Sequence, residues 1–247
     1  TLTGMPLFFA DHGWAKTLMW FLGGVEGAGT IHRVLAVLLF INFAVHIGAA
    51  WQRKRHHGSL RAWLFGPNSL LPRWKDATDL FGMIRWFFRG GAKPKFDRWT
   101  YWEKFDYWAE IFGTAVIGGT GLLLWFPDFF SSFLPGWIFN VAMIVHGYEA
   151  LLAVGFIFTI HFFNAHLRPE KFPTDDVMFT GRLPEAEFKE ERELEYQRLL
   201  DAGELDRYRV EPTPAWQRRA AVAGGVAAMI IGTAMVLLII LAGLQVI

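Results

Sequence analysis

Four long apolar stretches, separated by polar segments, dominate the pattern of residues along this chain. Each stretch is close to or above the roughly 20 residues that a helix needs to cross a bilayer. Together they contain only three charged residues, which are Arg33, Glu110 and Glu149. The pattern predicts transmembrane helices over residues 31–51, 108–126, 137–164 and 220–247.

Three other segments have patterns of their own. Residues 80–88 (LFGMIRWFF) are apolar but too short to span a membrane, which predicts an interfacial amphipathic helix flanked by Arg85 and Arg89. Residues 185–208 are dense in Glu and Arg at helical spacing, which predicts a solvated helix held by charge pairs. Residues 1–10 (TLTGMPLFFA) have the pattern of the outer end of a membrane helix.

The composition fits a membrane protein and narrows its chemistry. Of the 247 residues, 53% are hydrophobic and 19% are charged, whereas soluble domains carry about 25% charged residues. The chain has no cysteine, which excludes disulfides, thiolate-bound iron–sulfur clusters and covalently attached c-type haem within it. The net charge of +1 gives no indication of nucleic-acid binding.

The distribution of basic residues predicts an orientation. Residues 52–107 and 165–219 contain 22 of the 24 Lys and Arg residues, and the others are Lys16 and Arg33. Because cytoplasmic loops carry the excess of basic residues, we expect a multi-pass protein of the inner (plasma) membrane with both segments in the cytoplasm. Residues 1–30, residues 127–136 and the C-terminus are then extracytoplasmic.

Four histidines lie within the predicted membrane helices, where ionisable residues are costly and usually functional. His32 and His46 are 14 residues apart on the first helix, which is about 21 Å of rise and roughly 40° short of whole turns. His146 and His161 are 15 apart on the third helix, which is about 22 Å and roughly 60° past whole turns. Each pair therefore lies along one side of its helix, and the two helices run in the same direction.

This spacing predicts two haems stacked across the membrane. His32 and His146 would be the axial iron ligands of the outer haem, and His46 and His161 those of the inner haem. Two imidazole ligands leave no open position on the iron, which favours electron transfer. We therefore expect an all-α membrane protein, a bundle of four transmembrane helices enclosing two b-type haems, with amphipathic and charged helical segments in the cytoplasm.

Other readings of these side chains remain open. A histidine in a membrane helix can simply hydrogen-bond to a neighbour, and a zinc or di-iron site would need its ligands in one cluster. His166 is a fallback ligand or an interfacial residue near quinone or lipid headgroups. Glu149 can serve a proton relay or a plain hydrogen bond, and His56 and His57 are expected on a solvated cytoplasmic edge.

Three segments resemble the cytochrome b (gamma) subunit of respiratory formate dehydrogenases. The first is GTIH at residues 29–32, and the second is residues 95–108 leading into a glycine-rich helix that ends LLLWFP. The third is IVHGYEALLAVGFIFTIHFF at residues 144–163. The resemblance covers about residues 1–170 and rests on motif order, loop length and histidine placement.

The resemblance implies a di-haem b cytochrome that passes electrons between an extracytoplasmic partner and a menaquinone site near the inner haem. By position, His32 and His146 match the outer-haem ligands and His161 matches one inner-haem ligand. The family's other inner ligand lies on a helix that would precede residue 1. Either His46 takes that role here, or such a preceding helix supplies the ligand.

The quinone site and the partner are less closely matched to that family. Where the family has Asn, Gly and Gln, this chain has Asp97, Trp99 and Glu103, so we expect the quinone (menaquinone or ubiquinone) near Asp97, Glu103 and His166. The fourth helix and residues 165–219 depart from the family pattern. They suggest a different complex, whose extracytoplasmic subunit is a multihaem cytochrome c or an iron–sulfur or molybdenum oxidoreductase.

The sequence thus predicts four parts: an outer segment 1–30, a haem-binding membrane region 31–164 with its loop 52–107, a charged segment 165–219, and a membrane helix 220–247. The predicted function is an electron-transfer subunit of a respiratory complex that contacts lipid, quinone and an extracytoplasmic redox subunit. A haem-free anchor for a peripheral enzyme is the alternative. A transporter with Glu110 and Glu149 as proton sites is disfavoured, because four helices without an internal repeat are few for a transport fold.

Overall fold

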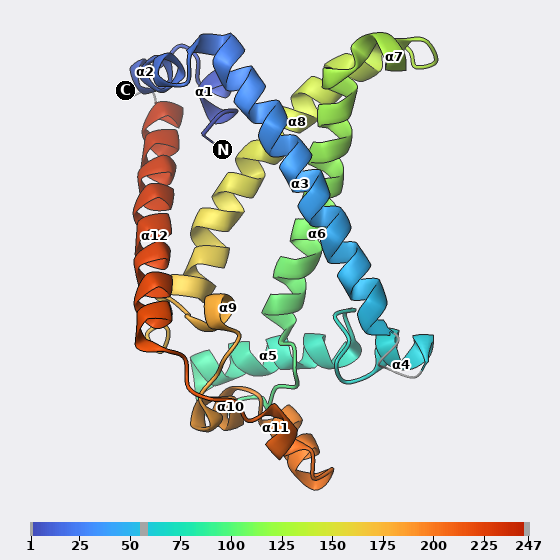
Figure 1. Cartoon of the computed structure of the whole chain (residues 1–247), viewed down its shortest axis with the longest axis vertical. Coiled ribbons are helices and arrows are strands. Elements are labelled where there is room, and N and C mark those ends of the chain that lie inside the picture. Colours follow the sequence, from blue (N-terminus) through green and yellow to red (C-terminus); the bar gives the residue numbers. More distant parts are fainter. Residues whose placement is uncertain (1, 55–58, 245–247) are drawn as a thin grey trace. The chain divides into compact units, whose positions relative to one another are not determined.

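The computed structural model describes residues 2–54 and 59–244, and every regular element within these ranges is helical (Figure 1). Four helices are long and apolar enough to cross a membrane, in agreement with the four predicted spans. They are Gly24–Lys54, Tyr101–Trp125, Trp137–Leu167 and Ala215–Gly243. The expectation for His56 and His57 lies outside the described residues.

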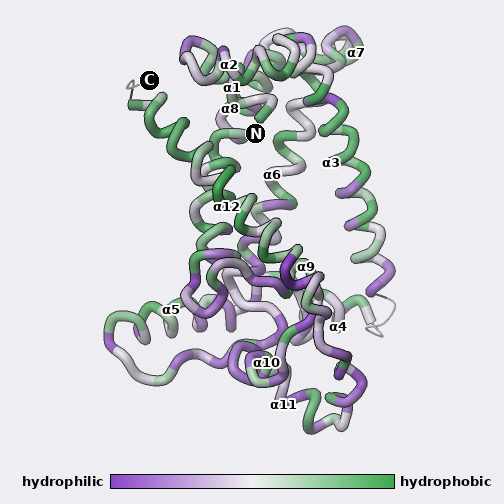
Figure 2. Tube along the Cα trace, turned by 60° about the vertical axis from the view of Figure 1, so that its left-hand side comes forward, coloured by the Kyte–Doolittle hydropathy of each residue, from purple (hydrophilic) through white to green (hydrophobic). Residues whose placement is uncertain are grey.

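Contacts along the chain group it into two compact units, which are described separately. The first unit consists of Thr1–Ile47, Glu110–Asp175 and Val222–Ile247. The second consists of Gly48–Ala109 and Asp176–Ala221. The colouring in Figure 2 follows this division, because hydrophobic residues predominate along α3 (Gly24–Lys54) and α12 (Ala215–Gly243), and hydrophilic ones around α10 (Glu185–Glu191).

In the first unit, two short helices precede the first membrane helix. They are α1 (Met5–Phe8) and α2 (Gly13–Phe21), and the predicted membrane-helix end at residues 1–10 takes the form of a four-residue helix and turns. The core of this unit joins α1 to the third and fourth membrane helices. Its buried centre consists of Met5, Val154 and Met235.

Helix α12 packs closely on the third membrane helix because small residues let the two approach. A Cβ added at Gly232 would overlap ring atoms of Phe158 and Phe162. At the C-terminal end of α12, the Nε2 of His12 lies 3.2 Å from the carbonyl oxygen of Ala242. This contact places the C-terminal end of α12 beside the start of α2, as Figure 1 shows.

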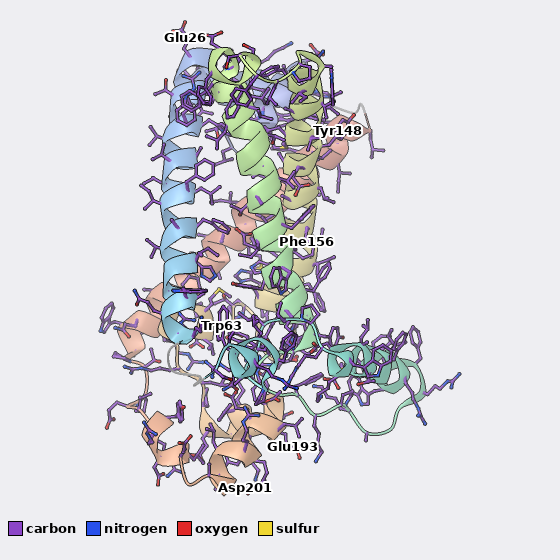
Figure 3. The ribbon with its side chains drawn as sticks, turned by 90° about the vertical axis from the view of Figure 1, so that its right-hand side faces the viewer. Glu26, Trp63, Tyr148, Phe156, Glu193 and Asp201 are labelled. Carbon is purple, nitrogen blue, oxygen red and sulfur yellow. The ribbon has the colours of Figure 1, made fainter. Side chains whose placement is uncertain are left out.

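The third membrane helix changes its winding partway along. It is α-helical in α8 (Trp137–Phe156) and continues as the π-helical segments η2 (Ile157–His161) and η3 (Phe163–Leu167). Phe156, labelled in Figure 3, is the last residue of the α-helical part. Such π turns are rare and are frequent at functional sites, and the sequence pattern did not predict them.

The second unit contains the predicted amphipathic helix, which is longer than expected. Helix α5 spans Trp74–Arg89, rather than residues 80–88 alone. Its first turn is capped by Asp76, whose carboxylate accepts a 2.6 Å hydrogen bond from the backbone N–H of Arg73. The buried Lys104 Nζ donates to the same carboxylate at 2.8 Å and to the carbonyl oxygen of Leu71 at 3.3 Å. Gly90, with φ of 71°, ends the helix.

The charged segment departs from the single helix predicted over residues 185–208. It forms α10, then α11 (Glu193–Asp201) and the 3₁₀ turn η4 (Leu205–Tyr208), with a break at Arg192. Glu193 and Asp201, labelled in Figure 3, lie at the two ends of α11. At the break, the backbone N–H of Leu194 donates to the carbonyl oxygen of Phe96 at 3.0 Å.

Many of the charges in this segment pair with residues 95–103 rather than along a single helix. Arg192 donates to Glu103 at 2.6 Å, and Arg198 donates to Asp97 at 2.6 Å. Arg98 donates to Glu195 at 2.9 Å, and Lys95 pairs with Glu193. Tertiary ion pairs therefore hold these four charged residues, and the expectation of one solvated helix is corrected to two helices and a turn.

Candidate functional site: a histidine pair beside an apolar cavity

His32 of α3 and His146 of α8 lie next to each other within the first unit. Their ring centroids are 6.1 Å apart, and the ring planes are inclined by 81°. Both side chains are half-buried. The structure thus brings together the two histidines that the sequence assigned to one site, across 114 residues of chain.

Each of the two rings is held at its Nδ1 atom by a neighbouring group. The Oγ1 of Thr3 lies 3.0 Å from Nδ1 of His32. Nδ1 of His146 lies 3.1 Å from Oγ1 of Thr120 and 3.1 Å from the carbonyl oxygen of Ile117. Because a carbonyl oxygen can only accept, we assign the ring proton of His146 to Nδ1. The Nε2 of His146 is then left with a lone pair that can bind a metal.

The two threonines could not be identified from local sequence patterns. Thr120 is 26 residues from His146, and Thr3 is 29 residues from His32. A metal-binding histidine almost always donates its other ring N–H to an oxygen, which fixes the tautomer and the ring orientation. The hydrogen bonds of His146 have this arrangement, in which a hydroxyl and a carbonyl oxygen hold Nδ1.

The histidine pair lines a half-open cavity of about 500 Å³, bordered by α1, α3, α6 (Tyr101–Trp125) and α8. Cofactor and ligand pockets usually measure about 300–1,000 Å³ and are mostly apolar, with a few convergent polar groups. The cavity fits this description, because its polar side chains are Thr3, Arg33 and the two histidines. Its apolar lining includes Leu35, Ala36, Leu39, Phe40, Ile117, Leu122, Leu124 and Trp125.

Glycines of α6 form part of one wall of this cavity. A Cβ at Gly121 would lie 3.2 Å from Cε1 of His146, and one at Gly118 would lie 2.8 Å from Cε1 of Phe40. Gly119, between them, faces a direction in which a Cβ would meet nothing within 4 Å. Gly118 and Gly121 thus let the rings of Phe40 and His146 lie close against the backbone of α6.

The spacing of the two rings fits a bis-imidazole iron site. Metal–imidazole bonds of about 2 Å on each side, with roughly 1 Å from each bonded nitrogen to its ring centre, place the two ring centres about 6 Å apart. The observed separation is 6.1 Å. The donor set and the hydrogen-bonded Nδ1 atoms therefore fit a haem held by His32 and His146.

The other predicted pair lies further along the same two helices. His46 is an exposed residue of α3, and His161 is the exposed last residue of η2. Since a π turn rotates by less per residue than the roughly 100° of an α-helix, the 60° excess expected between His146 and His161 is reduced. The π-helical winding turns His161 toward the side of the helix that carries His146. The pairing of His46 with His161 stays a prediction.

The two carboxylates expected near a quinone have structural partners in the second unit. Glu103 forms a capping box with Thr100, accepting from its backbone N–H at 2.8 Å and its hydroxyl at 2.7 Å. The T-x-x-E pattern before the apolar helix was the sequence signal for this role. Asp97 is buried and accepts from Arg198, with Arg73 at 3.7 Å. Their predicted place beside a quinone is untested.

Three further candidates lie in the first unit. His166 is buried, and its Nδ1 donates to the carbonyl oxygen of Pro173 at 3.3 Å. Glu149 lies against α6, because a Cβ added at Gly113 would come within 3.2 Å of its Oε1. Glu110 accepts a 3.3 Å hydrogen bond from Thr114 on its own helix.

No group of three or more His, Asp or Glu side chains suited to a metal ion occurs among residues 2–54 and 59–244. The histidine pair and its cavity are the candidate functional site. Comparison with protein-family models, with curated proteins and with solved structures gives no match to this chain.

Proposed function

We propose that this chain is a di-haem b-type cytochrome, the membrane subunit of a respiratory complex. It would carry electrons between the quinone pool and an extracytoplasmic redox partner, either a multihaem cytochrome c or an iron–sulfur or molybdenum oxidoreductase. The observation that carries the proposal is the pair His32 and His146, with rings 6.1 Å apart beside an apolar cavity. The resemblance to formate dehydrogenase gamma subunits, in motif order and loop length, also supports it.

Haem bound at this site would supply one-electron transfer, and two imidazole ligands would leave the iron no open position for oxygen chemistry. His32 and His146 would hold the haem iron. Thr3 and Thr120 orient the two rings through their Nδ1 atoms. The mostly apolar lining would lower the local dielectric around a bound haem, and Gly121 lets the ring of His146 lie close to α6.

A second haem toward the other end of the same helices completes the proposed path across the membrane. His161 is the ligand that both the spacing and the family resemblance support. His46 is the proposed partner because it lies 14 residues along α3 from His32. A ligand from a helix preceding residue 1 is the alternative, and the experiments below distinguish the two.

The decisive measurement is a pyridine haemochrome spectrum of the purified chain. A b-type α-band with about two haems per chain is expected, and each histidine variant should lose one of them. His32→Ala and His146→Ala should remove the same haem, so their double variant should lose no more than either alone. His46→Ala and His161→Ala should together define the other haem in the same way.

His12→Ala is the matched control, because His12 contacts the end of α12 rather than the cavity. It should retain both haems. A colourless wild-type protein would instead support the haem-free anchor, in which the histidines only hydrogen-bond within the protein. Loss of a haem in His161→Ala but not in His46→Ala would assign the remaining ligand to another segment.

A further inference from the structure

Helix α5 presents a wide aromatic face that nothing in its own unit covers. Trp74, Phe81 and Phe88 follow one another at seven-residue intervals, which places them on one side of the helix. Their exposed fractions are 83%, 69% and 78%. Large side chains exposed in this number mark a binding or membrane-contacting surface.

The opposite side of α5 carries its acidic residues, and these are paired within the unit. Asp79 is buried and accepts from Lys75 at 2.6 Å. Asp76 accepts from Lys104 at 2.8 Å. The aromatic side is therefore free of negative charge.

Two arginines stand on the aromatic side. Arg85 and Arg89 line a groove of about 390 Å³ together with Phe81, Ile84 and Phe88. Both are exposed, and within the part of the chain that the structure describes neither forms an ion pair. A groove lined by cationic and aromatic side chains is suited to a ligand that joins an anionic group to an apolar part.

We propose that this face of α5 lies in the headgroup region of the bilayer and binds anionic phospholipid through Arg85 and Arg89. The aromatic rings would enter the boundary between headgroups and acyl chains, as in other amphipathic interfacial helices. The two guanidinium groups would bind the lipid phosphate, for which arginine is well suited.

Three observations favour lipid over a protein partner. The chain has four helices able to span a membrane, so a bilayer is its expected surrounding. Only residues 90–100 separate α5 from α6, one of those four helices. The face combines aromatic residues with uncompensated arginine, which complements an anionic headgroup surface.

The absence of cysteine allows a direct test. The full-length Phe88→Cys variant is labelled with a single nitroxide and placed in nanodiscs. Power-saturation EPR then compares the accessibility of the label to oxygen, which enters lipid, with its accessibility to a water-soluble nickel chelate. Leu200→Cys is the control, because Leu200 is a half-exposed apolar residue of the charged helix α11. Phe81→Cys provides a second position on the aromatic face.

The labels at 88 and 81 should shift toward oxygen accessibility as phosphatidylglycerol replaces phosphatidylcholine, while the label at 200 stays accessible to nickel. Arg85→Gln should raise by about fivefold the phosphatidylglycerol fraction that gives half of this shift. Arg89→Gln should act in the same direction.

Three results would overturn the proposal. Nickel accessibility at 88 and 81 equal to that at 200 would place the face in water. Protection from both reagents would mean that protein covers it, such as a second copy of the chain. Equal oxygen accessibility in both lipids and in the arginine variants would show that the arginines do not select anionic headgroups.

Discussion

The hydroxyl of Thr120 links the ring of His146 to the backbone of α6. Its Oγ1 lies 3.1 Å from Nδ1 of His146 and 2.7 Å from the carbonyl oxygen of Val116. The hydroxyl donates its proton to the carbonyl, so its oxygen is available to accept from the ring N–H. The helix that contributes the glycine wall therefore also positions a proposed iron ligand.

Thr120→Val should weaken haem binding by about 10- to 100-fold, as loss of such an orienting partner does in other metal sites. Retention can be measured as the rate of haem transfer to an excess of apomyoglobin, together with the reduction potential of the haem that remains. Thr30→Val is the control, because the Thr30 hydroxyl bonds to the Glu26 carbonyl oxygen within α3. Equal transfer rates in the two variants would contradict this role for Thr120.

Gly121→Leu should displace the haem proposed at the His32 and His146 site while leaving the helices intact. Even a Cβ at this position would lie 3.2 Å from His146, so a larger side chain would fill the cavity beside the ring. Haem content and the circular dichroism spectrum are the two measurements. Gly119→Leu should bind haem normally, since a Cβ there meets nothing within 4 Å. Loss of haem in both variants would point to general disruption of α6.

Lys104→Met should destabilise the protein by about 3–5 kcal/mol, because it leaves the largely buried Asp76 carboxylate without its cation. The side chains of Lys104 and Asp76 are 2% and 12% exposed. Chemical denaturation of the detergent-solubilised chain measures the change. Lys95→Met removes a pair whose side chains are 60% and 45% exposed, and it should cost about 0–1 kcal/mol. Lys104→Met combined with Asp76→Asn should recover part of the loss.

The ion pair of Glu185 and Arg209 should give the second unit a pH dependence. Hydrogen bonds from Arg209, and then from Tyr196, lower the pKa of Glu185 below its usual 4.5. Because the pKa is lower in the folded state, the stabilisation is present above 4.5 and is lost as the pH falls through the lowered value. The thermal midpoint of Glu185→Gln should therefore fall below that of wild type at neutral pH, and the two should converge in acid. A constant difference down to the lowest pH would refute this assignment.

Local patterns were sufficient to predict the helical class and the four membrane helices, because hydrophobicity over about 20 residues is a property of each segment alone. The ends of the helices were harder to predict from sequence. Helix α6 begins at Tyr101 rather than at residue 108, because Thr100 and Glu103 cap it there. The capping pattern was present in the sequence, but the charge of Glu103 led to its assignment to a quinone site.

Other interactions missed by sequence reasoning depend on tertiary structure. The break at Arg192 lies in a segment with good helical spacing, and its causes are contacts with Phe96 and Glu103 about 90 residues away. Thr3 and Thr120 likewise became candidates only after the helices were placed beside each other. Histidine spacing, by contrast, identified His32 and His146 in advance because both lie on regular helices.

The π-helical winding also affects how this chain must be aligned with others. Fourteen residues separate His32 from His46, and fifteen separate His146 from His161. A π turn holds one more residue than an α turn, so the interval from His146 to His161 contains the equivalent of one residue inserted into an α-helix. An ungapped alignment to a purely α-helical relative would shift every position beyond the insertion by one residue, or about 100° around the helix. A one-residue gap between Gly155 and His161 keeps the histidines in register.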